Sequence, residues 1–178
     1  KLPTAEYVPL LDGTMNGWNA KTTAAAWKPS DGSMAYSGGN PTTVSTKKDY
    51  ENFEMYLDWK TSGEAGIAVR SIPQIGLGIE GGSGTLLGNK VNVSKPLLNA
   101  DNQKGEWNTL YVKVVDDRVT VVLNGQMVTR NVILENSCQP DSPAFIKGKI
   151  ELMGEGAPVE FRDLYIRELP PTPVYTLS

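Results

Sequence analysis

The segment 53–60, FEMYLDWK, alternates apolar and polar side chains without a break. Phe53, Met55, Leu57 and Trp59 occupy every second position, and charged residues or tyrosine fill the positions between them. Successive side chains of a β-strand point to opposite faces, so we expect a strand with one face in a core and the other toward solvent. The 3.6-residue period of a helix does not fit this pattern.

Similar alternation recurs along most of the chain. Segments 63–71, 73–81 and 149–156 each carry one apolar face, and segment 157–169 adds a shift at Arg162-Asp163 that predicts a β-bulge. Between residues 108 and 132, Asn124-Gly125 separates two β-branched runs, which predicts a type I′ hairpin. No segment holds a helical pattern over three turns, and 18 Gly with 12 Pro interrupt the chain. We therefore predict an all-β sandwich.

The segment 76–81, GLGIEG, has the G-x-G-x-x-G spacing of a dinucleotide-binding loop. Such a loop needs a helix after the glycines, and the residues that follow have no helical period. We instead expect Gly76 and Gly78 inside a strand, on the face that also carries Gln74 and Glu80. Two glycines on one face predict a flat trough that another molecule can approach. The alternative, that they only relieve crowding in a curved sheet, stays open.

Further polar residues join this face if neighbouring strands pair in chain order. Arg70 and Asp58 would then lie beside the glycines, and the groove would be edged by a guanidinium, an amide and carboxylates. These groups suit hydrogen bonding to a polyhydroxylated ligand. Tyr56, on the polar side of its strand, is a further candidate for ligand contact.

Composition limits the chemistry. The 178-residue chain fits one domain and has no histidine, which excludes Ser-His-Asp and Cys-His arrangements and His-ligated metal centres. The net charge of -3, without a Lys/Arg cluster, predicts no positively charged surface for nucleic acid or an anionic membrane. No apolar run is long enough for a membrane span. The single Cys138 is expected to be a small, partly buried side chain. We predict no metal or cofactor site.

The order and spacing of several motifs resemble those of the 3-keto-disaccharide hydrolase domain family. The motifs are LLDGTMNGW (10–18), DYENFEMYLDWK (49–60), AGIAVR (65–70), PQIGLGIE (73–80), KGEWNTLYVKV (104–114), VTVVLNGQMV (119–128), KIELMGEG (149–156) and PVEFRDLYIREL (158–169). The resemblance implies a concanavalin A-like jelly-roll sandwich of two antiparallel sheets that binds carbohydrate on its concave face. It also implies an exported bacterial protein, periplasmic or at the cell surface. We expect one domain over residues 1–169 and a Pro-rich tail over 170–178.

The resemblance further implies action on glycosides whose sugar carries a 3-keto group. Such a ketone acidifies the neighbouring C2 hydrogen, so the glycosidic bond can be broken by elimination and hydration with a base and an electrophile. Arg70 matches the arginine after the family's S-G-I motif, and Asp58 stands at the usual acidic position. Where members often read E-V-Q-I, this chain has GLGI at 76–79. Where they often read L-Q-D-H-G, Met153 and Glu155 replace the Gln and the His.

These departures leave three interpretations. In the first, the protein is a carbohydrate-active hydrolase in which Glu80, Glu155 and Asp58 supply the acid and base and Arg70 holds a sugar oxygen or stabilises an enolate. In the second, it is a non-catalytic carbohydrate-binding module of the same fold with a degenerate site, and in the third it is a structural or interaction domain. The first interpretation expects these four residues to project from one face. The ligand contacts would come from Arg70, Gln74, Gly76, Gly78 and Tyr56.

Overall fold

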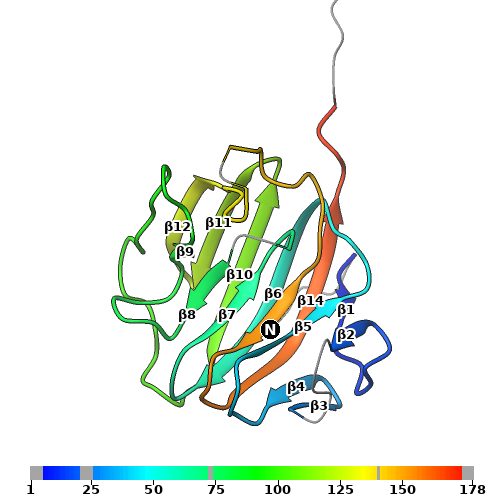
Figure 1. Ribbon diagram of the computed structural model, residues 1–178. Helices are drawn as coiled ribbons and strands as arrows, with labels where there is room; N and C mark the ends of the chain where they lie inside the picture. Colours follow the sequence, from blue (N-terminus) through cyan, green and yellow to red (C-terminus); the bar gives the residue numbers. More distant parts are fainter. Residues whose placement is uncertain (1–5, 21–25, 72–73, 140, 174–178) are drawn as a thin grey trace, which may run out of the picture.

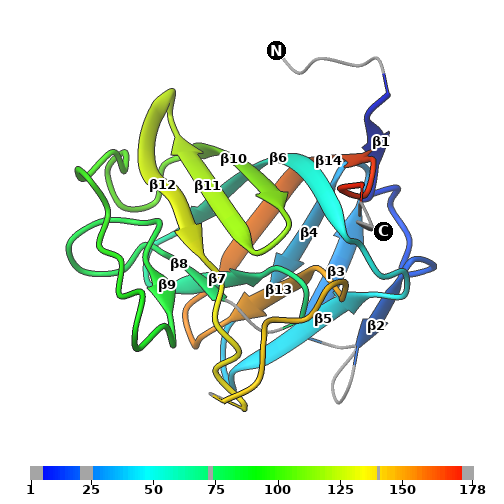
Figure 2. The same ribbon diagram turned by 90° about the horizontal axis from the view of Figure 1, so that it is seen from above.

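A computed structural model describes residues 6–20, 26–71, 74–139 and 141–173. Within these residues the chain forms β-strands and turns and no helix, and every strand pair is antiparallel. The strands form two sheets, which lie one behind the other in Figure 1 and are seen from above in Figure 2. The all-β prediction is confirmed.

The larger sheet has eight strands in the described part of the chain. In spatial order they are β12 (Gln126–Ile133), β11 (Arg118–Leu123), β10 (Asn108–Val115), β6 (Asn52–Thr61), β14 (Val159–Leu169), β4 (Ser33–Tyr36) and β3 (Trp27–Ser30), with β1 (Val8–Pro9) paired to β14. β6 therefore lies inside the sheet, hydrogen-bonded to β10 on one side and β14 on the other.

The smaller sheet has six strands among the described residues. Their order is β2 (Trp18–Ala20), β5 (Thr42–Thr46), β13 (Glu151–Gly154), β7 (Ala65–Ala68), β8 (Gln74–Leu77) and β9 (Leu86–Leu87). The chain passes from β6 of the larger sheet to β7 of the smaller one, and from β13 of the smaller sheet to β14 of the larger one. At these two points, strands that follow each other in sequence belong to different layers.

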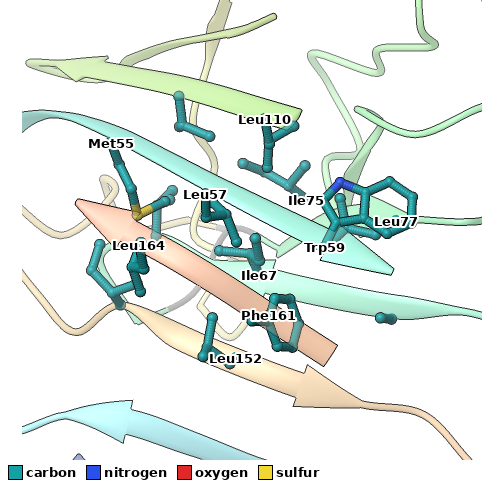
Figure 3. Packing of buried hydrophobic residues seen from close by; sticks show 14 of the residues in the cluster. Met55, Leu57, Trp59, Ile67, Ile75, Leu77, Leu110, Leu152, Phe161 and Leu164 are labelled. Atoms are coloured by element: carbon teal, nitrogen blue, oxygen red, sulfur yellow. The ribbon is translucent and has the colours of Figure 1, made fainter. Parts of the chain in front are cut away.

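The core lies between the two sheets. The alternating apolar residues of β6 point into it and are buried, as the sequence predicted. Figure 3 shows Met55, Leu57 and Trp59 of this strand in one cluster with residues of the smaller sheet: Ile67, Ile75, Leu77 and Leu152. Complete burial of a side chain of this size contributes about 1.5–3 kcal/mol relative to leaving it exposed. The polar residues of β6 must then face away from the smaller sheet.

Two local predictions are confirmed. Asn124 and Gly125 both have positive φ angles, 50° and 81°, as a type I′ turn between β11 and β12 requires. The pairing of β14 with β6 shifts between Arg162 and Tyr165, and Asp163 between them has a φ of 54°. This is the β-bulge that the sequence indicated, and it keeps Leu164 in the core.

The predicted strand over 73–81 is too long. β8 ends at Leu77, and Gly78 follows with a φ of 67°. The Gly78 N–H donates to Ser83 Oγ at 2.8 Å instead of continuing the sheet. A Cβ at Gly78 would overlap the carbonyl oxygen of Gly63, so this position requires glycine for space as well as for φ. Ile79 is therefore outside the strand and only partly buried.

Candidate functional site

The outer face of the smaller sheet carries a row of small and polar residues. Register places Ser45 of β5 beside Glu151 of β13, Glu151 beside Ala68 of β7, and Ala68 beside Gln74 of β8. Asn19 of β2 extends the row on the far side of Ser45. Neighbouring strands lie about 4.8 Å apart, so the Cα atoms of Glu151 and Gln74 are separated by about 10 Å. The row thus places a carboxylate and an amide on one surface, with alanine between them.

The next row on this face is formed by Met153, Gly66 and Gly76. The side chain of Gln74 lies over Gly66, because a Cβ built there would overlap the Gln74 amide nitrogen. Gly66 therefore lets the amide lie flat along the sheet. Met153 adds an apolar group beside Glu151.

The predicted glycine-floored trough is wrong in its geometry. A Cβ at Gly76 would lie 2.7 Å from Ile79 Cδ1 and 3.2 Å from Leu87 Cδ1, so these side chains cover the glycine. Gly78 lies beyond the strand, for the reason given above. Of the two glycines, Gly76 alone shares the sheet surface with Gln74. Contact of either glycine with a ligand stays a prediction.

Glu80 and Glu155 lie at the same end of the smaller sheet. β8 ends at Leu77 and β13 ends at Gly154, and Ala65 of β7 pairs with both of these residues. Glu155 follows Gly154 directly, and Glu80 lies in the turn after β8; both are exposed. The structure thus brings the two predicted acid–base residues to the same end of the smaller sheet. Their catalytic role stays a prediction.

Asp58 does not share a face with Glu80 and Glu155. It lies on β6, in the middle of the larger sheet, and points away from the smaller sheet. Its carboxylate accepts hydrogen bonds from Arg162 Nε at 3.1 Å and Thr109 Oγ1 at 2.8 Å. The prediction of one shared face is wrong because β6 and β7 pair with different neighbours and belong to different sheets.

Tyr56 also lies on the outer face of the larger sheet. Its ring contacts Tyr7 and Tyr111, with centroid distances of 5.6 and 4.9 Å. Tyr111 Oη donates to Glu54 Oε2 at 2.6 Å, and Arg167 donates to the other carboxylate oxygen. Burial and the Glu54 carboxylate raise the pKa of Tyr111, whereas hydrogen bonds from Tyr111 and Arg167 outweigh burial and lower the pKa of Glu54. Tyr56 thus belongs to a second polar surface, separate from the smaller sheet.

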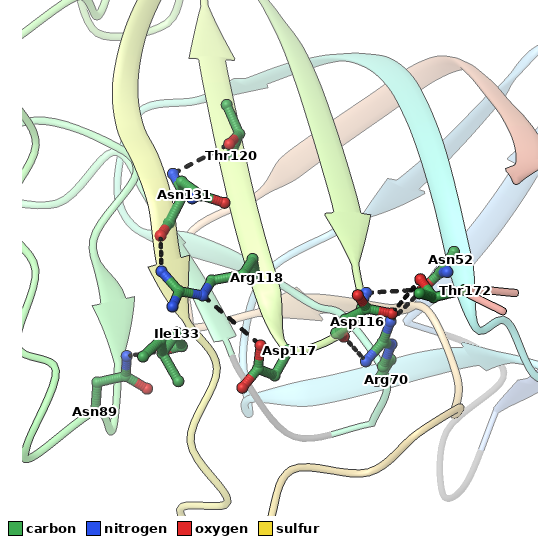
Figure 4. A network of polar contacts seen from close by, with 10 residues as sticks. All are labelled: Asn52, Arg70, Asn89, Asp116, Asp117, Arg118, Thr120, Asn131, Ile133 and Thr172. Atoms are coloured by element: carbon green, nitrogen blue, oxygen red, sulfur yellow. Dashed lines mark hydrogen bonds and ion pairs between the residues drawn. The ribbon is translucent and has the colours of Figure 1, made fainter. Parts of the chain in front are cut away.

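Arg70 is not on the outer face of the smaller sheet either. It follows β7 with a φ of 48°, and its side chain is only 3% exposed. Figure 4 shows the guanidinium between Asn52 and Asp116. Nε donates to the Glu51 carbonyl at 2.8 Å, Nη2 donates to Asn52 Oδ1 at 3.0 Å, and Nη1 donates to the Asp116 carbonyl. Burial lowers the pKa of Arg70. Arg70 therefore ties β6 to the turn between β10 and β11.

Arg70 also forms part of the wall of a pocket of about 250 Å³. Ala144, Phe145 and Ile146 supply the apolar side of that pocket, and Phe145 and Ile146 are exposed. This pocket lies at the end of β6 where the chain enters the strand, and none of the other predicted site residues lines it.

Glu151 is the polar residue that the sequence reasoning missed. Ile150 and Leu152 are buried in the core, and alternation along β13 therefore turns Glu151 to the outer face. The same alternation is visible in the sequence KIELMGEG, where the motif comparison drew attention to Met153 and Glu155 instead. Glu151 is partly buried and interacts with neighbouring residues.

Three further observations concern metals, membranes and the cysteine. The described residues contain no group of three His, Cys, Asp or Glu side chains placed to hold a metal ion. None of the described segments forms a helix long and apolar enough to cross a membrane.

Cys138 is exposed, contrary to the expectation of partial burial, because it lies in the segment between β12 and β13 and outside both sheets.

The two sheets form a concanavalin A-like jelly-roll sandwich, a fold shared by several carbohydrate-active proteins of known structure. A candidate glycosyl hydrolase from Parabacteroides distasonis superposes with a TM-score of 0.70 at 22% identity, over 93% of this chain and 94% of that one. The carbohydrate-binding module CBM66 from Bacillus subtilis gives 0.64 at 11% identity, over 85% and 96%. Bacillus licheniformis β-glucanase gives 0.58 at 11% identity, over 92% and 97%.

The sequence places the chain more narrowly than the fold does. Residues 6–167 match the 3-keto-alpha-glucoside-1,2-lyase-like domain, and the chain belongs to this family. The motif order in the sequence indicated the same family. No curated protein sequence matches the chain.

Proposed function

We propose that the protein binds a glycoside across the outer face of the smaller sheet and cleaves it at a sugar that carries a 3-keto group. Membership of the lyase-like family supports the reaction class. One observation supports the location: Glu151 and Gln74 stand in one row of the sheet, with the small side chain of Ala68 between them. Ala68 itself is only 1% exposed, so the sugar would lie on the partly exposed side chains of Glu151 and Gln74, whose polar groups its hydroxyls can reach.

The proposed reaction needs one base and one acid. The base removes the proton at C2, and the electron pair of that C–H bond forms an enolate with the C3 ketone. The electrons of the enolate then form a double bond between C1 and C2, and the C1–O bond breaks. The aglycone oxygen leaves with the electron pair of that bond and takes a proton. Water then adds across the C1–C2 double bond, and the sum of the two steps is hydrolysis.

We assign the base to Glu151, because it lies on the outer face of β13, one of the two central strands of the smaller sheet. Glu155 and Glu80 are the candidates for the acid that protonates the leaving oxygen, since both lie at the edge where β13 and β8 end. Gln74 would hold a ring hydroxyl through its amide, and Gly66 keeps that amide flat on the sheet.

The test is release of sugar from 3-keto-glycosides and from the matching ordinary glycosides. Glu151→Gln should lower kcat/KM by about 100- to 10,000-fold, the usual contribution of a general base. Glu160→Gln is the matched control, because Glu160 lies on the outer face of the larger sheet, 3.7 Å from Lys60 Nζ. Glu151→Gln with undiminished activity would remove Glu151 from the mechanism.

A second candidate function is binding of a carbohydrate without cleavage. Met153 supports it, because an apolar side chain lies on the outer face directly beyond the Glu151 row. In that case sugars should raise the melting temperature, and the increase should shrink in Glu151→Gln and Gln74→Ala, while no sugar is released from any glycoside.

A further inference from the structure

A polar pocket of about 180 Å³ lies at one end of the sandwich, apart from the outer face of the smaller sheet. We call it the end pocket. Its lining includes Trp59, Thr61, Gly78, Asp101, Lys104 and Asn108. They come from β6 and β10 of the larger sheet and from the loops that follow β8 and precede β10. Glu151 and Gln74 do not line it.

The acidic wall of the end pocket is held in place by a buried serine. Ser83 is fully buried, its N–H donates to Asp101 Oδ1 at 2.8 Å, and its hydroxyl donates to Asp101 Oδ2 at 2.6 Å. The same hydroxyl accepts the Gly78 N–H. Each oxygen of Asp101 retains a further lone pair, so the carboxylate can accept hydrogen bonds in a fixed position.

The basic wall is held in place by backbone carbonyls. Lys104 Nζ donates to the Gly63 carbonyl at 2.9 Å and to the Gly78 carbonyl. No carboxylate of the described residues lies within ion-pair distance of this ammonium group. An ammonium group has three N–H donors, so one is left for another partner.

Two buried residues, Trp59 and Asn108, line the floor of the end pocket. Trp59 is 2% exposed, and its indole Nε1–H has no hydrogen-bond partner among the described residues. Trp59 lines the pocket, so its indole resonance can report on a ligand bound there. Asn108, also buried, keeps its amide fixed by accepting hydrogen bonds from Asn102 N and Asn124 Nδ2, both at 2.8 Å.

We propose that the end pocket is a second binding site, for one neutral sugar unit or a small polyol of similar size. The carboxylate of Asp101 and the ammonium of Lys104 face the same space, so each disfavours a ligand of its own sign. Hydroxyl groups can donate to Asp101 and accept from Lys104. The volume equals that of about six waters in the liquid, which is room for about one hexose unit. This site does not depend on the proposed glycoside cleavage.

The test follows the indole N–H resonance of Trp59 in proton–nitrogen NMR spectra, assigned with Trp59→Phe. Titration with glucose, galactose, mannose and xylose should move this resonance and reach saturation with at least one of them. Glucuronate and glucosamine should bind more weakly than the matching neutral sugar. A disaccharide whose terminal sugar unit enters the pocket should move the same resonance. A disaccharide whose terminal unit does not enter should leave the resonance unchanged, so the comparison shows whether the pocket takes free sugars alone or also the ends of sugar chains.

Variants connect the response to the end pocket. Lys104→Met should weaken binding by about tenfold or more, because a charge-assisted hydrogen bond is lost. Lys95→Met is the matched control, since Lys95 is exposed and does not line the pocket. If Lys104→Met does not fold, Gln103→Trp serves instead, because Gln103 is exposed at the pocket wall and a larger side chain there should block entry.

Glu151→Gln should leave the NMR response of Trp59 unchanged, so this result is independent of the proposed catalysis. An indole resonance that no neutral sugar moves would overturn the proposal. Unchanged binding in Lys104→Met, or a response to charged sugars alone, would overturn it as well.

Discussion

Arg70 and Asn52 are joined by a hydrogen bond of 3.0 Å between Nη2 and Oδ1, inside the protein. Asn52 Oδ1 also accepts the Asp116 N–H at 2.9 Å, and its Nδ2 donates to the Pro170 carbonyl at 3.2 Å. One amide thus connects the start of β6, the turn after β10 and the residue after β14. These contacts hold the arginine that the motifs placed at a ligand, and its contact with a ligand stays a prediction.

Asn52→Ala should therefore destabilise the protein by about 2–3 kcal/mol, because it leaves the buried guanidinium of Arg70 and the backbone N–H of Asp116 without their acceptor. Urea unfolding followed by tryptophan fluorescence measures the change. Lys113→Ala, at an exposed site on β10, should change stability by less than about 0.5 kcal/mol. Equal stability of Asn52→Ala and the control would show that the network contributes little.

Gly154→Ala should also destabilise the protein, by about 1–3 kcal/mol, because a Cβ at Gly154 would overlap the ring of Tyr36. Tyr36 is buried and its hydroxyl donates to the Asn40 carbonyl at 2.7 Å, so the ring has little freedom to move. Thermal unfolding measures the effect, and a melting temperature equal to that of the wild type would contradict it.

Gly66→Ala should affect ligand binding more than stability. The group that a new Cβ meets is the far end of Gln74, a partly exposed and flexible side chain that can move away. Binding of the glycoside should weaken to about the level of Gln74→Ala, while the melting temperature falls by only a few degrees. Normal binding in Gly66→Ala would mean that the position of the Gln74 amide is unimportant.

Stability should fall in acid partly through Glu54. Its pKa is lower in the folded protein than the ordinary value of about 4.3, because Tyr111 and Arg167 hydrogen-bond to the carboxylate and outweigh its burial. The stabilisation is present above the ordinary pKa and is lost as the pH falls through the folded pKa. Tyr111→Phe should reduce this loss, measured by urea unfolding between pH values of about 6 and 3. An unchanged pH profile in Tyr111→Phe would contradict the assignment.

Glu135 should control the loop after β9. Its carboxylate accepts backbone N–H groups of Lys90 at 2.9 Å, Val91 at 3.0 Å and Asn92, and these hydrogen bonds lower its pKa. Glu135→Ala should speed amide hydrogen exchange at residues 90–92 by about tenfold or more and leave exchange in β6 unchanged. Equal exchange rates in both proteins would indicate that the loop is fixed by other contacts.

Alternation was enough to predict the fold class and the faces of individual strands. Phe53 to Trp59 are buried at alternate positions, and the Asn124-Gly125 turn has the φ angles that its sequence demands. These features depend on local geometry, which the sequence encodes directly. Family membership followed from the order of motifs rather than from alternation.

The composition of the site was harder to predict, because a strand's pattern does not reveal which sheet it joins. Asp58 and Gln74 both lie on polar faces, yet β6 and β8 belong to different sheets and those faces point in opposite directions. Arg70 and Gly78 have positive φ angles that end the alternation beside them. Export to the periplasm or the cell surface stays a prediction.

The most direct test of the central claim is a crystal structure of Glu151→Gln soaked with a 3-keto-glycoside. We predict that the sugar lies on the outer face of the smaller sheet, with its C2 within hydrogen-bonding reach of residue 151 and a hydroxyl bound to Gln74. A sugar bound instead on the larger sheet, against Tyr56 and Asp58, would contradict the claim.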